Sequence, residues 1–162
     1  GCLEGRGFDE AGEHGFVVLD IDENSGSSDT YFVPFARRNI YVAQVDVTGC
    51  ENTFEIEKCV RSFLEMSGYT KESLVKVELT GALDVECEKN TDYLGKQFEG
   101  KFYAFKIKDN TTYNIDYMSY EHDMSLKGEY IRNVMARNDI SEQDKAELIR
   151  YGLQALQGEE IG

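Results

Sequence analysis

The 162-residue sequence contains no tryptophan, one proline and two histidines, and its 17 basic residues are outnumbered by 31 acidic ones. A formal net charge of −14 argues against broad, non-specific attraction to nucleic-acid phosphates or anionic lipid. It leaves room for a local basic patch, because salt screens distant charges more than near ones. No signal segment opens the chain and no apolar run is long enough to span a bilayer, so we expect a cytoplasmic protein with no membrane partner.

The four cysteines are too few for a disulfide scaffold at this length. Cys2, Cys50, Cys59 and Cys87 are scattered and include no CxxC pair, which fits a reducing compartment. Cys59 falls on a helical apolar stripe, a position typical of a small buried hydrophobe.

Catalytic motifs are also missing. The two histidines, His14 and His122, match neither HExxH nor a paired-ligand spacing, and no GxxxxGK[ST] phosphate loop is present. Cys50 has no basic neighbour in sequence to activate it as a nucleophile. We therefore expect this chain by itself to hold no metal or cofactor and to catalyse nothing. One alternative is a small stand-alone enzyme that uses His14 or His122 with nearby carboxylates.

Apolar residues are plentiful, at 41%, and their spacing predicts an α+β chain with a mixed or antiparallel sheet, flanking helices and a closing αα-hairpin. Pro34 is expected to end a strand or mark a sheet edge. The polar residues 109–111 predict an antiparallel hairpin between two late strands. Strands are predicted at 15–22, 30–33, 40–48, 75–79, 102–108 and 112–118.

Helices are predicted from spacing at period 3.6 together with end signals. Asn52, followed three residues later by Glu55, resembles a capping box, and Gly68 is expected to stop that helix. Ser141 is expected to start the last helix and Gly158 to stop it. The predicted helices cover 52–67, 92–98, 126–135 and 141–157.

The opening of the chain carries the most specific pattern. Gly5–Glu10 reads GRGFDE, inside a loop rich in glycine, and the apolar strand Gly15–Leu19 follows it. This order resembles the segment after the last metal-binding motif, Gly-His-x-His, in SbcD-like DNA repair exonucleases of the calcineurin-like metallophosphoesterase superfamily. Further on, the segments that resemble the family are Tyr31–Arg38, Gln44–Gly49 (entry to the accessory domain), and Asp139–Glu142, Lys145 and Gly152–Leu156 (closing helix pair).

The resemblance implies that the chain is the C-terminal region of such an enzyme, which acts in double-strand break repair. The metal-binding Asp, His and Asn residues would lie upstream, in a missing nuclease core that uses a divalent metal such as manganese. Residues 1–37 would be the last strands of the phosphoesterase core, 38–120 an α+β cap that orients DNA, and 121–162 a helix pair. Implied partners are the chain's own N-terminal nuclease core, an SMC-like coiled-coil ATPase, and DNA, which the isolated chain should bind weakly.

A cap that contacts DNA should carry a basic surface, and in this acidic chain the candidate DNA contacts are few. Lys106 and Lys108 lie two apart on a predicted strand and so share one face, which is either a phosphate contact or a solvated surface. The full candidate set is Arg6, Arg37, Arg38, Lys101, Lys106 and Lys108.

Candidate partner-docking residues lie on the last two helices. Their apolar face, which includes Ile131, Ile149 and Leu153, either packs on the chain's own sheet or leaves part of itself for a partner coiled coil. The docking candidates are Tyr130, Met135, Tyr151 and Leu156. A competing interpretation is an acidic interaction module that docks the ATPase and never touches DNA.

Overall fold

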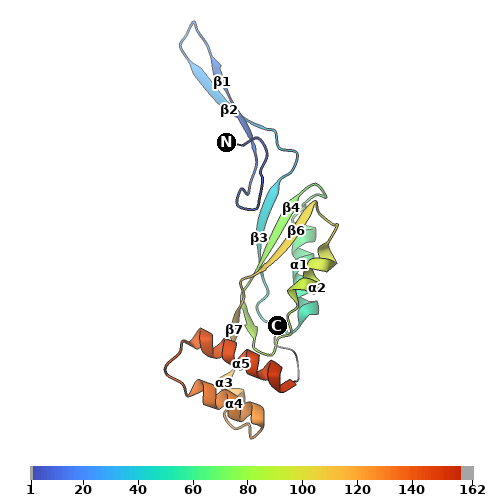
Figure 1. Ribbon diagram of the computed structural model, residues 1–162. Coiled ribbons are helices and arrows are strands. Elements are labelled where there is room, and N and C mark those ends of the chain that lie inside the picture. The colour runs from blue at the N-terminus through green and yellow to red at the C-terminus, as the bar shows by residue number, and fades with distance from the viewer. Residues whose placement is uncertain (1, 158–162) are drawn as a thin grey trace. The chain divides into compact units, whose positions relative to one another are not determined.

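The computed structural model describes residues 2–157 and confirms the α+β class, with helices and both antiparallel and parallel strand pairs (Figure 1). The chain divides into two compact units whose segments interleave along the sequence. Unit one takes residues up to Gln44, Ser62–Glu78 and Thr91–Lys108, and unit two takes Val45–Arg61, Leu79–Asn90 and residues from Asp109 on. The division into parts at residues 37 and 120 stays a prediction.

The first two strands form a ribbon of their own. β1 (Gly15–Ile21) and β2 (Ser28–Pro34) pair antiparallel, with Val17 opposite Phe32. Pro34 ends β2, as predicted, because proline cannot donate to a ladder. The side chains of β1 and β2 are exposed almost throughout, apolar ones included.

The second sheet has three strands in the order β3 (Ile40–Asp46), β4 (Leu74–Thr80), β6 (Ala104–Asp109). The Leu74 N–H donates to the Asn39 carbonyl at 3.0 Å, at the start of β3 and β4. The Val47 N–H donates to the Thr80 carbonyl at 2.9 Å, at their ends, so these two strands run parallel.

Two helices cover one face of this sheet, α1 (Thr53–Met66) and α2 (Thr91–Phe98), as Figure 1 shows. Strict alternation in β4 places the fully buried Val75, Val77 and Leu79 on one face. The polar residues between them lie on the opposite face.

The predicted end signals of α1 are confirmed. The Glu55 N–H donates to the Asn52 side chain at 3.1 Å. The Glu55 carboxylate in turn accepts from the Glu51 N–H at 2.9 Å, one residue earlier than a standard capping box. Gly68 follows the helix with a φ of 67°, which glycine adopts without strain.

The predicted antiparallel hairpin of 102–108 with 112–118 is wrong. β7 (Thr112–Asn114) pairs in parallel with β5 (Ala82–Asp84), a short strand that directly follows β4. The Asp109 carboxylate does accept from the Thr111 N–H at 3.0 Å. This polar turn delivers the chain to a new partner, because the Thr112 N–H donates to the Gly81 carbonyl at 2.9 Å.

The end of the same predicted strand is helical instead. α3 (Tyr117–Tyr120) begins after Asp116, whose side chain accepts from the Met118 N–H at 3.2 Å. An Asp side chain that satisfies a helix N–H favours this turn over a continued strand.

The last two helices are α4 (Leu126–Met135) and α5 (Glu142–Gln157), capped by Ser125 and Ser141. They contact each other, and the αα-hairpin itself stays a prediction. Gly158, the expected stop of α5, lies outside the described residues. The buried cluster of this region comprises Val85, Ile115, Ile131, Val134, Ala146, Ile149 and Leu153.

Candidate nucleic-acid and partner interfaces

Two of the predicted DNA-contact residues lie on the three-stranded sheet, on the face opposite α1 and α2, which we call the open sheet face. Lys106 and Lys108 are exposed on β6, on the face opposite to the half-buried Phe105 and Ile107. Lys76 and Glu78 lie on the adjacent strand β4, on the same face by the alternation of that strand. Three lysines and one glutamate therefore meet here, in a chain of formal net charge −14.

Lysines of this group interact with Glu78. The Lys76 Nζ donates to the Glu78 carboxylate at 2.6 Å. This hydrogen bond lowers the pKa of Glu78, and the charges of Lys76 and Lys108 lower it further. Glu78 is therefore ionised at neutral pH and offsets one of the three positive charges. The surplus that is left suits a phosphate contact of modest strength.

Sequence reasoning missed Lys76 because it assigned β6 a different neighbour. The alternation of Val75, Val77 and Leu79 did place Lys76 on an outward face. With β6 assigned to a hairpin, nothing brought that face beside Lys106. The signal that could have found it is the parallel order of the three strands, which the helical connections α1 and α2 favour.

The other predicted cations lie elsewhere. Arg37 pairs with Glu72 at 3.4 Å, and Arg38 pairs with Glu4 at the same distance. The Arg38 guanidinium also stacks 3.9 Å from the centre of the Tyr103 ring. The structure thus brings Lys106 and Lys108 together on one face and engages both arginines with acids.

Lys101 and Arg6 complete that set. The Lys101 ammonium lies 4.8 Å from the centre of the Phe98 ring. Arg6 is exposed in the opening loop, where its backbone N–H donates to the Glu10 carboxylate at 2.8 Å and lowers the pKa of Glu10.

The opening loop is shaped by close packing at its glycines. A Cβ on Gly5 would lie 2.4 Å from Ile40, and one on Gly15 would lie 2.0 Å from the Val33 carbonyl oxygen. The Nε2 atom of His14 donates to the Glu10 carbonyl at 2.8 Å. His14 therefore helps to hold the loop.

The predicted docking residues differ in burial. Tyr130 is half-buried, and its hydroxyl donates to the Leu148 carbonyl of α5 at 2.7 Å. Tyr151 and Leu156 are exposed, and the Arg150 guanidinium lies 4.4 Å from the centre of the Tyr151 ring. Met135 packs against the buried cluster from its side. Of the four, Met135 also lines a pocket.

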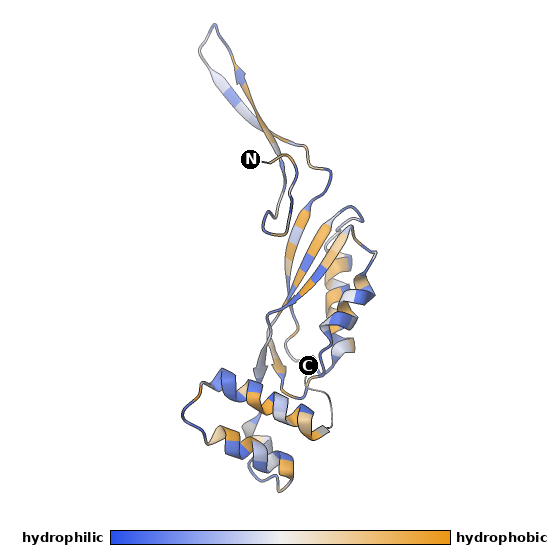
Figure 2. Cartoon of the chain, viewed as in Figure 1, coloured by the Kyte–Doolittle hydropathy of each residue, from blue (hydrophilic) through white to orange (hydrophobic). Residues whose placement is uncertain are grey.

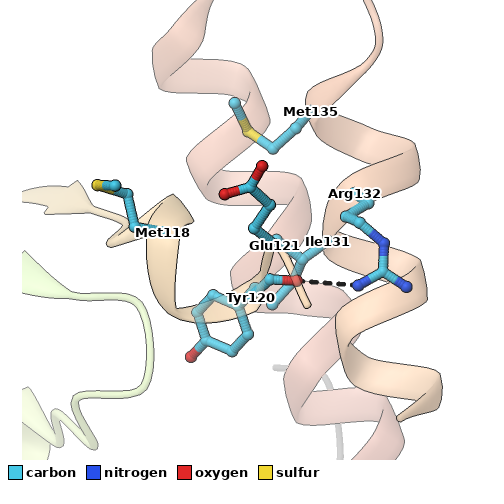
Figure 3. A pocket seen from close by; sticks show the side chains of 6 residues that line it. All are labelled: Met118, Tyr120, Glu121, Ile131, Arg132 and Met135. Carbon is cyan, nitrogen blue, oxygen red and sulfur yellow. Dashed lines mark hydrogen bonds between the residues drawn. The ribbon is translucent and has the colours of Figure 1, made fainter. Parts of the chain in front are cut away.

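That pocket lies between α3 and α4 and has a volume of about 370 Å³ (Figure 3). Figure 3 shows two methionines at its rim, Met118 from α3 and Met135 from α4, and the Tyr120 ring points away from both. Methionine side chains are flexible and polarizable, so they adapt to varied apolar partners. The full lining is Met118, Tyr120, Glu121, Ile131, Arg132 and Met135.

Arg132 is the structural anchor of the pocket. Its Nη1 atom donates to the Tyr120 carbonyl at 2.9 Å and to the Asp123 carbonyl at 2.5 Å. These bonds fasten the end of α3 and the residues just after it to α4. Sequence reasoning missed Met118 because it read residues 112–118 as a strand. Without α3, nothing placed Tyr120 beside Arg132 of the predicted helix 126–135.

Among residues 2–157, no three His, Cys, Asp or Glu side chains gather in an arrangement that could hold a metal ion. Within the same residues, no helix combines the length and the apolar character that a membrane crossing requires. Comparisons of this chain with family models, with curated proteins and with solved structures found no match.

Proposed function

We propose that this chain is the C-terminal cap and partner-docking region of an SbcD-like, metal-dependent DNA repair exonuclease. It orients DNA and holds an SMC-like ATPase, while the chemistry, with manganese as the divalent metal, belongs to a nuclease core encoded upstream. The protein acts in the cytoplasm. The proposal rests on the resemblance of Gly5–Glu10 and the segments after it to that family.

One structural observation carries the proposal further, the exposed apolar surface of β1 and β2. Val17, Leu19 and Ile21 are 64%, 56% and 58% exposed. A two-stranded ribbon is marginal by itself, and large apolar patches on a monomer mark contact sites. Strands at the edge of a phosphoesterase layer would bury these residues against the core, as the resemblance implies for residues 1–37.

The lysines of the open sheet face support a DNA-orienting role. Lys76, Lys106 and Lys108 come from two adjacent strands and act on the same side of the sheet. Because the rest of the chain is acidic, they would position DNA already held by a core rather than capture it.

The pocket between α3 and α4 supports partner docking. An apolar groove beside a helix accepts side chains that recur at i, i+3 and i+4 on a partner helix. Met118 is 83% exposed at the rim of the groove, so a partner would find it uncovered.

The parentage is tested by the reading frame upstream of Gly1. We expect it to encode Asp-x-His and Gly-His-x-His motifs, and we expect the longer protein to degrade DNA in the presence of manganese. The 162-residue chain should hydrolyse neither DNA nor simple phosphodiesters under the same conditions. Turnover by this chain that is lost on His14→Ala or His122→Ala would support the stand-alone enzyme instead.

The DNA role is tested by the salt dependence of duplex binding. A few phosphate contacts give a shallow slope of log K against log salt, about −0.9 per neutralised phosphate. Lys106→Glu with Lys108→Glu should abolish what binding there is, whereas Lys58→Glu, on the exposed side of α1, should weaken it little. Unchanged binding in the double variant would favour an interaction module without DNA contact.

The docking role is tested by alanine variants of Tyr130, Met135, Tyr151 and Leu156, each measured for stability and for capture of the purified ATPase. Docking residues should lose affinity and keep stability. If no variant weakens capture, the docking assignment is wrong.

A further inference from the structure

A second groove, separate from the methionine pocket, follows the outer side of β6. It has a volume of about 650 Å³ and lies between α2 and residues 102–107. One stripe of α2 forms its wall, where Asp92, Gly95 and Lys96 recur at helical spacing, and Glu99 follows directly after the helix. Six consecutive residues on the strand side line the groove, so the backbone of β6 borders it.

That backbone edge is unpaired within the part of the chain that the structure describes, where β4 is the only sheet neighbour of β6. The Tyr103 N–H donates to the Ser73 carbonyl at 3.0 Å, just before β4. Hydrogen-bonding groups alternate along a strand, so Ala104 and Lys106 direct their N–H and C=O groups to the outer edge. An edge of this kind is a template for a further strand.

The wall of the groove leaves room for such a strand. Gly95 lies in the middle of α2, yet a Cβ built on it would meet no atom within 4 Å apart from the neighbouring backbone of its own helix. Glycine in a helix interior destabilises the helix relative to alanine, which makes an open glycine at this position notable.

The side chains around the groove indicate which strand would fit. A strand added beside β6 would send alternate side chains to the open sheet face, next to Lys106 and Lys108. Its other side chains would turn toward α2, over Gly95 and the half-buried Phe105. The charged residues that line the groove are two lysines, Lys96 and Lys106, and two acids, Asp92 and Glu99, and Lys108 adds a further positive charge on the same sheet face as Lys106.

We propose that the groove binds an extended peptide segment of a partner protein, in which acidic residues alternate with apolar ones, by adding it to β6 as a fourth strand. The acidic residues pair with Lys106 and Lys108, and the apolar residues pack between α2 and β6. Strand addition gives affinity through the main chain and specificity through alternate side chains. This binding site goes beyond the proposed function and does not depend on it.

The test uses the 162-residue chain and the acetylated, amidated heptapeptide Val-Glu-Val-Glu-Val-Glu-Val. In NMR titrations we expect saturable changes in backbone amide chemical shifts, confined to β6 and α2. The dissociation constant should be on the order of 1 mM or tighter. The same peptide with lysine in place of glutamate should bind at least about tenfold more weakly, a difference of ~1.4 kcal/mol.

Gly95→Leu is the decisive variant, because its side chain fills the groove while leucine favours the helix more than glycine does. Gly95→Ala is the matched control, which keeps the groove open and should bind the peptide as the native chain does. Gly95→Leu should lose peptide binding and leave duplex DNA binding unchanged, since it leaves the lysines in place.

Each of three results with the peptide would overturn the inference. They are the absence of shifts in the native chain at millimolar peptide, equal binding by Gly95→Leu and Gly95→Ala, and equal binding of the lysine peptide. Loss of DNA binding in Gly95→Leu would identify the groove as a nucleic-acid site and likewise overturn it. Because DNA binding and peptide binding are read separately, failure here is distinguishable from failure of the proposed function.

Discussion

The strands β1 and β4 are both largely apolar in sequence, yet their environments are opposite. Val75, Val77 and Leu79 of β4 are fully buried, whereas Val17, Leu19 and Ile21 of β1 are more than half exposed. Both strands carry apolar stretches in Figure 2. The difference comes from what covers them, because α1 and α2 lie on the face of the sheet that contains β4.

An apolar strand sequence therefore predicts that the strand is buried, but it does not predict which part of the structure covers it. β4 is covered by helices of the same chain. On our proposal, β1 is covered by a nuclease core outside this chain.

The largest expected effect separates Leu79→Ala from Leu19→Ala. Removing a fully buried leucine leaves a cavity, so Leu79→Ala should lower the free energy of unfolding by ~2–5 kcal/mol. Leu19→Ala should change it by less than about 1 kcal/mol, because the side chain is mostly in water already. Urea unfolding of the two variants measures both, and equal losses would show that the ribbon is buried in solution.

A smaller effect is expected at the contact between α4 and α5. Tyr130→Phe removes the hydroxyl that donates to the Leu148 carbonyl, which should cost ~0.5–1.5 kcal/mol of stability. Urea unfolding gives the value, and Tyr151→Phe, on an exposed ring, is the control. A neutral Tyr130→Phe would favour Tyr130 as a docking residue over a structural one.

The cysteines should differ in reactivity as the strands differ in burial. Burial and a hydrogen bond with Cys59, whose sulfur lies 3.7 Å away, raise the pKa of Cys50 from 9.0 to about 12. Burial also raises the pKa of Cys87. Because thiolates are the reactive form, both should be alkylated far more slowly than the half-buried Cys2 at pH 8. Mass spectrometry of the native chain checks the order.

The same shift gives the pH dependence a sign. The folded state keeps the Cys50 proton that the unfolded state releases, so this contribution to stability is full below pH 9 and falls as the pH rises toward 12. Cys50→Ser should flatten the loss of stability above pH 9. An unchanged alkaline profile would contradict the buried, protonated thiol.

The smallest expected effect concerns Asp139, between α4 and α5. A hydrogen bond from Arg137 lowers the pKa of Asp139 from 3.8 to about 2. A lowered carboxyl pKa stabilises the fold above pH 3.8, and that contribution is lost as the pH falls toward 2. Arg137→Ala should return the pKa toward its usual value in an NMR titration, with little change in stability because both groups are exposed.

Much of the local structure could be predicted from sequence because its signals are local. Asn52 with Glu55, Gly68 and Pro34 all mark the element ends that they predicted. The partner of each strand could not be predicted, since the spacing of Lys106 and Lys108 gives a face but not a neighbour. The short strand β5 was also missed, because three residues are too few to show the alternation that marks a strand.

The candidate sites show the same limit. Lys106 and Lys108 could be predicted as a pair because two residues on one strand share a face. The place of Lys76 beside this pair could not be predicted, because it depends on which strand lies next to β6. The pocket depends on α3, where the Asp116 side chain overrides an alternating pattern that reads as a strand.

The central claim is that β1 and β2 are covered by polypeptide outside these 162 residues, and amide hydrogen exchange tests it most directly. The 162-residue chain is compared with the same residues inside the longer protein that we propose its reading frame encodes. We predict that amides of β1 and β2 exchange much faster than those of β4 in the shorter chain, and that they become as protected as β4 in the longer protein. Protection equal to that of β4 in the shorter chain, or no gain in the longer protein, would contradict the account.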